Sequence, residues 1–530
     1  MFEYIFVRTF EEQTPMMNLR DDIPAGVVVF LVALPLCLGI ALASDAPLMS
    51  GIIAGVIGGL VVSWASGSSL SVSGPAAGLA TIVAAGIGDL GFEAFLVAVV
   101  LAGLLQIVLG VARAGFFAEL FPISVIKGML AAIGIILILK QIPHALGRDE
   151  DPEGDLSFWV PGTEENTFSE IFLAFQTASP GVILITVVGL IVLIVWEKPF
   201  ISDKSWSRLL PGPLIAVALG VLMNEIYRLA VPSLYITPES GHLVQLPSFS
   251  SVSDLTSQLA SPDWSVIGHG DVWMLAFTIM AVASIETLLC VEATDKLDPL
   301  KRTTPMNREL MAQGLGNTLS GLIGGLPMTA VIVRSSANIY AGGRTRISSF
   351  THGVLLCGLV LSVPFLLNKI PLGTLAAVLL MVGYKLARIS LFKKMWADGL
   401  DQFLPFIVTI VATVLTDLLI GVSVGFVVGV VMVFLTNFHS AIRAEEADGK
   451  LHVILDKDVS FLNKTRLKSI LAGVPDGHSV FIDGSGATFI DHDIRDVIED
   501  FIISAEHRNI TVERARMAHR DHPLSFKKGA

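Results

Sequence analysis

The sequence predicts an all-α polytopic membrane protein of about fourteen transmembrane segments, followed by a small α/β domain. Two observations support this fold class. First, 53% of the 530 residues are hydrophobic and only 15% are charged, a composition too apolar for a domain surrounded by water. Second, apolar runs of about twenty residues recur between residues 22 and 438, and each run is long enough to cross the hydrocarbon core as a helix.

The chain divides into a cytoplasmic N-terminus over residues 1–21, a transmembrane domain over 22–438, a small domain over 445–516 and a disordered tail over 517–530. The first residues are partly acidic and do not resemble a signal peptide, so we expect the first apolar run to be a true membrane helix. The expected spans are 22–44, 50–66, 70–86, 92–112, 120–142, 180–196, 211–230, 272–295, 308–324, 326–341, 348–366, 371–390, 402–419 and 420–438.

Charged residues between the spans predict the orientation of the chain. Lys and Arg gather in short loops near residues 198–208, 296–308, 344–346 and 385–394, and short basic loops are typical of the cytoplasmic side. The acidic segment 149–170, and a long loop without Lys or Arg over 231–271, belong to the opposite side. We therefore expect both termini in the cytoplasm and the protein in the inner membrane of a bacterium.

The sequence offers no support for an enzyme or for nucleic-acid binding. Cys37, Cys290 and Cys357 lie inside apolar runs without metal-ligand spacing, and no nucleophile motif or phosphate-binding loop is present. The formal charge of -12 comes largely from one loop and from the C-terminal region. We expect no metal site and no cofactor apart from a coupling ion, either H⁺ or Na⁺.

Two of the expected spans are interrupted by Gly and Pro. The third contains SLSVSGPAAGLATIV over Ser69–Val83, and we expect its helix to begin at Pro75, because proline at the first helical position loses no hydrogen bond. The tenth contains GGLPMTAVIVRSSANIYAGG over Gly324–Gly343, with the helix start near Arg334. Matched interrupted segments in two halves of a chain indicate an inverted-repeat transporter with its site at the membrane midplane.

These two half-helices predict a site for a small anion. Helix N-termini carry unpaired N–H groups and about half a positive charge, and Arg334 adds a full charge. The candidate substrate-binding residues are Ser73, Gly74, Pro75, Ala76, Ala77, Arg334, Ser335 and Ser336. Two simpler interpretations stay open: Gly and Pro are common in membrane helices, and Arg334 could extend towards an interface.

Glu286 is the candidate coupling residue, because it lies inside the eighth span and an intramembrane carboxyl is by default a functional hypothesis. Its protonation would change as an anion or cation arrives. The alternative is a permanent ion pair with Arg334 that only stabilises the fold.

The chain resembles the SulP family of anion transporters, whose animal relatives form solute-carrier family 26, over nearly its whole length. The motifs that carry the resemblance are IPAGVVVFLVALPLCLGIALAS, LSVSGPAAGL, SIETLL, GGLPMTAVIVRSSANIYAGGRT and TDLLIGVSVGFVVGV. The resemblance implies a seven-plus-seven inverted repeat with core and gate domains, a homodimer in the lipid bilayer, and a C-terminal STAS domain. VFIDGSGATFID, over Val480–Asp491, resembles part of a STAS domain.

Departures from the family pattern bear on substrate and coupling. Leu36 follows Pro35 where sulfate-type members commonly have Gln, and the overall motifs look most like the bicarbonate branch linked to carbonic anhydrase. Cys290 and Ile332 replace hydroxyl residues of sodium-coupled members, so we expect H⁺ rather than Na⁺ coupling. If a cation does bind, its backbone ligands would come from Ala330, Val331 and Ile332.

The sequence therefore favours a secondary transporter of bicarbonate. A sulfate, other oxyanion or dicarboxylate proton symporter, an anion exchanger, an anion channel on the same scaffold and a nucleobase transporter remain alternatives. In the STAS-like tail, Asp491 is followed by His492 and Asp493 rather than by a serine, which argues against a phosphorylation switch at that point. We expect the tail to support folding and dimer contact.

Overall fold

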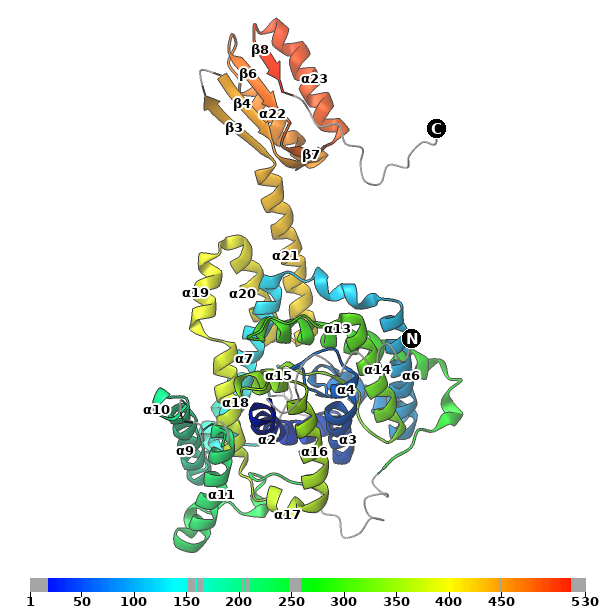
Figure 1. The fold of residues 1–530 in the computed structure, drawn as a ribbon, viewed down its shortest axis with the longest axis vertical. Coiled ribbons are helices and arrows are strands. Elements are labelled where there is room, and N and C mark those ends of the chain that lie inside the picture. The colour runs from blue at the N-terminus through cyan, green and yellow to red at the C-terminus, as the bar shows by residue number, and fades with distance from the viewer. Residues whose placement is uncertain are drawn as a thin grey trace. The chain divides into compact units, whose positions relative to one another are not determined.

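The computed structural model describes residues 18–150, 158–159, 165–202, 204, 207, 210–246, 259–447 and 450–515. The chain forms two compact units, Met1–Phe426 and Val427–Ala530 (Figure 1). Parts of the acidic loop, and all of the expected tail over 517–530, lie outside the described residues. Each unit is described here by itself.

The first unit is built almost entirely from helices, the last of which, α21, continues into the second unit, and each of the expected spans overlaps a helix. The helices are α2 (Leu19–Ala43), α3 (Leu48–Ile57), α4 (Ser63–Ala65), α5 (Ala80–Leu90), α6 (Phe92–Val111), α7 (Ile123–Leu146), α8 (Thr167–Gln176), α9 (Pro180–Trp196), α10 (Pro199–Ser202), α11 (Gly212–Ala230), α13 (Gly270–Leu297), α14 (Met306–Leu322), α15 (Ile332–Tyr340), α16 (Ile347–Ser362), α17 (Pro364–Leu367), α18 (Leu372–Leu386), α19 (Ile389–Ala397), α20 (Leu400–Leu415) and α21 (Leu418–Ser440). Among the described residues, eight segments are long and apolar enough to span a membrane, and the bent pair of α8 and α9 is a ninth candidate.

Two short strands pair with each other in the first unit. β1 (Ser73–Pro75) pairs antiparallel with β2 (Met328–Ala330), with Ser73 opposite Ala330 and Pro75 opposite Met328. After β1 comes a 3₁₀ turn, η3 (Ala77–Leu79), and then α5, while α15 directly follows β2. The expectation that the first half-helix begins at Pro75 is therefore wrong. Pro75 ends a strand instead, because the chain must stay extended to pair with Met328 before it can turn.

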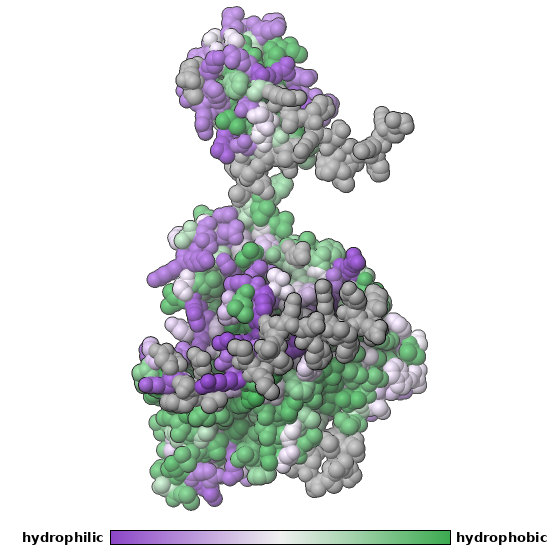
Figure 2. Space-filling view, viewed as in Figure 1, coloured by the Kyte–Doolittle hydropathy of each residue, from purple (hydrophilic) through white to green (hydrophobic). Residues whose placement is uncertain are grey.

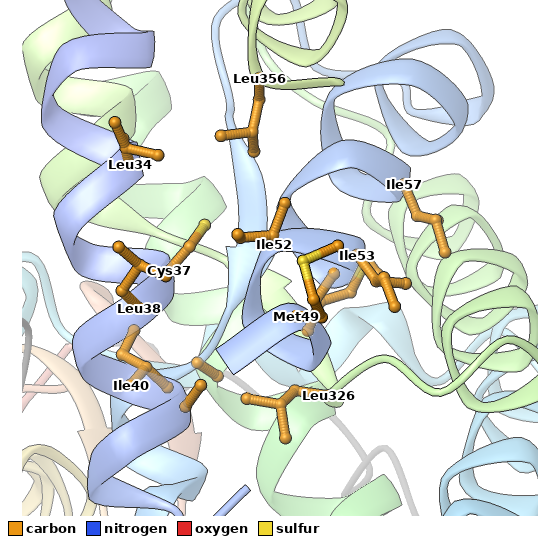
Figure 3. Packing of buried hydrophobic residues seen from close by; sticks show 14 of the residues in the cluster. Leu34, Cys37, Leu38, Ile40, Met49, Ile52, Ile53, Ile57, Leu326 and Leu356 are labelled. Carbon is orange, nitrogen blue, oxygen red and sulfur yellow. The ribbon is translucent and has the colours of Figure 1, made fainter. Parts of the chain in front are cut away.

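Helix α2 lies between two hydrophobic clusters that form most of the core. Leu34, Cys37 and Ile40 pack with Ile52 and Leu356 in one cluster (Figure 3). Residues on the opposite side of α2 join the second cluster, which includes α7 and α18. In the most apolar stretch of α2, 89% of the residues are buried, whereas only 28% are buried in the corresponding stretches of α11 and α21. Helix α2 is thus a core element, and α11 and α21 present apolar side chains to the surroundings, which agrees with the hydrophobic surface in Figure 2.

The second unit contains a four-stranded sheet of order β3-β4-β6-β8. Its strands are β3 (Ile442–Ala447), β4 (Lys450–Leu455), β6 (Ser479–Asp483) and β8 (Thr511–Arg514), and β5 (Lys457–Val459) pairs separately with β7 (Ala487–Ile490). Helices α22 (Lys464–Ala472) and α23 (His492–His507) pack on the sheet through an apolar core that includes Val453, Val480 and Ile498. These elements fit a STAS domain. The alternating and amphipathic stretches at 451–455, 463–471, 478–483, 491–505 and 510–513 predict strands and helices, and they coincide with β4, α22, β6, α23 and β8.

Close helix contact provides a test of the packing of the first unit. A Cβ atom at Gly353, on α16, would lie 2.7 Å from the backbone carbon of Gly59, whereas a Cβ at Gly358 on the same helix meets nothing within 4 Å. We expect Gly353→Leu to destabilise the purified protein by about 1–3 kcal/mol, because the opposing atoms are backbone and cannot move aside. Gly358→Leu should leave the thermal unfolding midpoint near that of the unmodified protein. Equal midpoints for the two variants would contradict this packing.

Candidate functional site

Strands β1 and β2 bring the starts of two half-helices to one small cavity. Ala77, at the start of η3, lines it from one side, and Val331, Ile332, Val333 and Arg334, at the start of α15, line it from the other. Because the N–H groups of a first helical turn lack partners within the helix, this end of each segment carries partial positive charge. The starts of η3 and α15 therefore face the same cavity.

The rest of the cavity wall is mostly apolar. The remaining lining residues are Leu36, Ile40, Ile133, Leu137, Glu286, Cys290 and Leu418. The cavity has a volume of about 30 Å³, enough for a water molecule. An anion of several heavy atoms would therefore need the lining helices to separate.

Glu286 contributes the acidic side chain of this wall. It lies on α13 and is 7% exposed, with its carboxylate beside Gly78 of η3 and the hydroxyl of Thr329 on β2. A Cβ atom at Gly78 would lie 3.0 Å from Oε2 of Glu286, so glycine is what lets the half-helix approach the carboxylate this closely. Glu286 is thus in contact both with the segment that follows β1 and with β2.

Arg334 occupies a different position from Glu286. Its side chain is 0% exposed, and its guanidinium lies against Gly74 of β1, where a Cβ atom would be 2.0 Å from Nη1. The neighbouring polar groups include the thiol of Cys37 on α2 and the buried ring of His352 on α16. No nitrogen of the guanidinium makes a hydrogen bond to any residue that the structure describes. A permanent ion pair between Arg334 and Glu286 is therefore not formed, and Arg334 does not extend to an interface.

The serine hydroxyls of the predicted site are already engaged in the fold. Ser73 Oγ accepts a hydrogen bond from Gln313 Nε2 at 2.6 Å, and Ser335 Oγ donates to the Val331 carbonyl at 2.8 Å. Ser336 Oγ donates to the Val333 carbonyl at 3.0 Å. Of the eight candidate substrate residues, Ala77 and Arg334 line the cavity; Ser73, Gly74, Pro75, Ala76, Ser335 and Ser336 form the buried framework around it.

The candidate cation ligands are divided in the same way. Val331 and Ile332 line the cavity, whereas Ala330 lies within β2 and its N–H points to Thr287 Oγ1 at 3.4 Å. Within the described ranges, no group of three or more His, Cys, Asp or Glu side chains is arranged to hold a metal ion.

Sequence reasoning missed the polar face of α14. Glu309, Gln313, Asn317 and Ser320 are all 0% exposed and contact the crossing strands or the segments beside them. The signal is visible in the sequence, because positions 309, 313 and 317 follow at intervals of four and therefore share one helix face. Such a polar stripe within an apolar bundle indicates that these side chains form hydrogen bonds inside the protein and do not contact lipid.

Comparison with known proteins agrees with this architecture. The model of the sulfate permease family matches residues 19–412. The putative sulfate transporter YvdB of Bacillus subtilis (strain 168) is 26% identical over 443 residues, 83% of this chain and 78% of that protein. The bicarbonate transporter BicA of Picosynechococcus sp. is 27% identical over 417 residues, 77% of this chain and 69% of that protein.

Solved structures show the same fold. The transmembrane domain of a cyanobacterial bicarbonate transporter BicA matches with a TM-score of 0.54 and 25% identity, covering 79% of this chain and 99% of that one. The inward-facing structure of the murine Solute Carrier 26 family member A9 anion transporter matches with a TM-score of 0.62 and 14% identity, covering 97% and 91%.

The unpaired guanidinium predicts an unusual stability effect. Burying a charge without a partner is costly, so Arg334→Met, which keeps the length and removes the charge, should raise the thermal unfolding midpoint in anion-poor buffer. The same variant should lose any stabilisation by added bicarbonate or sulfate. Arg228→Met, at an exposed position on α11, is the control and should change neither value. A lower midpoint for Arg334→Met would show that the guanidinium is satisfied in the protein.

Proposed function

This chain belongs to the sulfate permease family of anion transporters, and we propose that it is a secondary active transporter that binds a small inorganic anion between the half-helices of the third and tenth segments. The observation that carries the proposal is the convergence of the starts of η3 and α15 on one cavity, with the unpaired charge of Arg334 packed against it. Partial positive charges and a buried cation in a medium of low dielectric constant attract an anion strongly.

Two larger cavities beside α2 support alternating access. Val28 lines a cavity of about 340 Å³ that also contacts α9, α11, α15 and α18. Leu38 and Leu42, further along α2, line another of about 270 Å³ that reaches Asp149. The small cavity at Leu36 and Ile40 lies further along α2 than Val28, at the level of Pro35 and Gly39, which line the second cavity. A small relative movement of the helices flanking α2 would open the site to one side or the other.

The antiparallel pairing of β1 and β2 supports an inverted repeat. Strands preceding equivalent half-helices must run in opposite directions if the two halves enter the membrane from opposite faces, and β1 and β2 do so. We extend the proposal to a seven-plus-seven arrangement with core and gate domains, with both termini in the cytoplasm of a bacterial cell and with two chains forming a dimer.

Bicarbonate is the favoured substrate on physical grounds. The hydroxyls of Ser335 and Ser336 donate to backbone carbonyls, and the cavity wall is mainly apolar, so few side-chain donors remain for a highly charged anion. One arginine opposed by one carboxylate also suits a monovalent anion better than a dianion. Since relatives named for sulfate and for bicarbonate match at similar identity, sulfate is the second candidate.

Uptake into proteoliposomes tests the function and the substrate together. Purified protein is reconstituted and challenged with bicarbonate, sulfate, chloride and a dicarboxylate, with empty liposomes as the control. We expect saturable uptake of bicarbonate and weaker or no uptake of sulfate. Saturable sulfate uptake without bicarbonate uptake would assign the second candidate, and ohmic, nonsaturable currents would indicate a channel.

We expect Glu286 to couple transport to protons rather than to sodium, because Cys290 and Ile332 in the cavity wall supply no side-chain oxygen for a cation. Glu286→Gln has the shape of the protonated acid, so it should bind anion yet lose accumulation driven by a pH gradient. Glu292→Gln, on the same helix but paired with Lys296 at 2.9 Å, is the matched control and should keep that accumulation. Uptake by the unmodified protein should rise as the outside pH falls and should not change when potassium replaces sodium.

Bicarbonate itself converts to carbon dioxide at low pH, so this measurement needs a nontitrating competitor anion or counterflow. A sodium requirement that persists under these conditions would overturn the proton assignment. It would place a cation between Glu286 and backbone carbonyls near Ala330.

A further inference from the structure

Strands β1 and β2 are too short to hold their own register. Each has three residues, and an isolated two-stranded pair is marginal at best. Gly74 supplies no side chain to pack, and Pro75 has no N–H to donate. The register that positions both half-helices must therefore be maintained by contacts from other elements.

Helix α14 supplies a contact to each strand from positions one turn apart. Gln313 Nε2 donates to Ser73 Oγ on β1 at 2.6 Å. The side-chain amide of Asn317 pairs with both backbone groups of Met328 on β2: Met328 N–H donates to Oδ1 at 2.6 Å, and Nδ2 donates to the Met328 carbonyl at 3.1 Å. Asn317 thus acts as a one-residue substitute for a neighbouring strand.

Glu309, one turn before Gln313 on α14, determines the orientation of the Gln313 side-chain amide. Nε2 of Gln313 also donates to Glu309 Oε1 at 3.0 Å, and the other carboxylate oxygen of Glu309 accepts from Ser66 Oγ. A carboxylate only accepts hydrogen bonds. Glu309 therefore keeps the NH₂ group of Gln313 turned towards Ser73.

A second branch connects β2 with the helix that carries Glu286. Asn317 Nδ2 also donates to Gln106 Oε1 on α6 at 2.6 Å, and Gln106 Nε2 donates to Ser284 Oγ on α13 at 3.3 Å. Ser284 precedes Glu286 by two residues. Oδ1 of Asn317 accepts from Met328, and Nδ2 donates to Met328 and to Gln106. Because both ends of the side-chain amide are hydrogen-bonded, its conformation is well specified.

We propose that Asn317 is a positioning residue for the anion site, and that α14 fixes the register of β1 against β2 and ties β2 to the helix of Glu286. The proposal rests on the proposed function, because it takes the cavity between the half-helices as the anion site. Asn317 does not line that cavity and acts through Met328 and Gln106. Its removal should let α15 move relative to Glu286 and weaken anion binding.

The chain contains a matched control for a purely structural role. Asn224, on α11, holds the backbone of Ile236 with the same two hydrogen bonds, at 2.9 and 3.1 Å, and it is also buried. Neither Asn224 nor Ile236 contacts β1, β2 or the cavity wall. Alanine at Asn317 and alanine at Asn224 therefore remove the same type of contact from two different places.

Transport kinetics separate the two roles. We expect both Asn317→Ala and Asn224→Ala to lower the thermal unfolding midpoint, since each leaves two backbone groups without a partner, and Asn317→Ala to lower it somewhat more because Gln106 also loses a partner. Only Asn317→Ala should raise the half-saturating anion concentration, by about tenfold. Equal half-saturating concentrations for the two variants would overturn the proposal.

Hydrogen exchange provides a measurement that does not depend on the transported substrate. Backbone amides over residues 326–334 should exchange faster in Asn317→Ala than in Asn224→Ala or in the unmodified protein. Unchanged exchange there would reject the positioning role even if transport were impaired, whereas absence of uptake by the unmodified protein would reject only the proposed function.

The milder change Ser284→Ala tests the second branch and covers the case in which Asn317→Ala does not fold. It breaks the contact with Gln106 and leaves the Asn317 contacts with Met328 intact. We expect the pH dependence of uptake to shift while exchange over 326–334 stays unchanged. A pH profile identical to that of the unmodified protein would rule out the link to Glu286.

Discussion

The antiparallel pairing of β1 with β2 is the constraint on which the arrangement of the first unit depends. A helix that begins inside a bilayer leaves backbone groups at its end without partners, and the hydrocarbon core holds no water that could hydrogen-bond to them. The strands β1 and β2 satisfy some of these backbone groups by pairing with each other. The Val331 N–H also donates to the Val72 carbonyl at 2.9 Å. Side chains from α13 and α14 satisfy others, at Ala330 and Met328. Irregular backbone is thus tolerated because protein surrounds it on all sides.

The pairing of β1 with β2 also explains how Glu286 and Arg334 are accommodated in an apolar interior without forming an ion pair. Glu286 stands at the cavity beside Gly78, and Arg334 is buried against Gly74. An ion pair between them would neutralise the positive potential that an anion needs. Keeping them apart costs stability, since the guanidinium has no partner among the described residues, but under the proposed function it leaves the positive charge available to an anion. The proposed function would account for this arrangement, which stability alone would not select.

Glycine makes the close approaches of this region achievable. Gly74 and Gly78 are the positions at which an added Cβ would strike Arg334 and Glu286. Gly59 and Gly353 bring the segment after α3 against α16 in the same way. These residues carry no chemistry, yet they decide how near the charged groups come to the half-helices. Small residues at helix contacts are the common means of close packing where the hydrophobic effect does not drive helices together.

The sequence by itself determined the membrane class, the paired interruptions near Pro75 and Arg334 and the strand and helix order of the C-terminal unit, because these depend on local composition and periodicity. Only the tertiary structure decided that Pro75 ends a strand, that the serine hydroxyls are committed to the fold and that Arg334 and Glu286 do not meet. The polar face of α14 lay between these cases: its spacing was visible at Gln313 and Asn317, but their partners are far away in the chain. Hydrogen bonds between distant segments leave no local pattern, so the residues that hold this site together emerge only when the helices are packed.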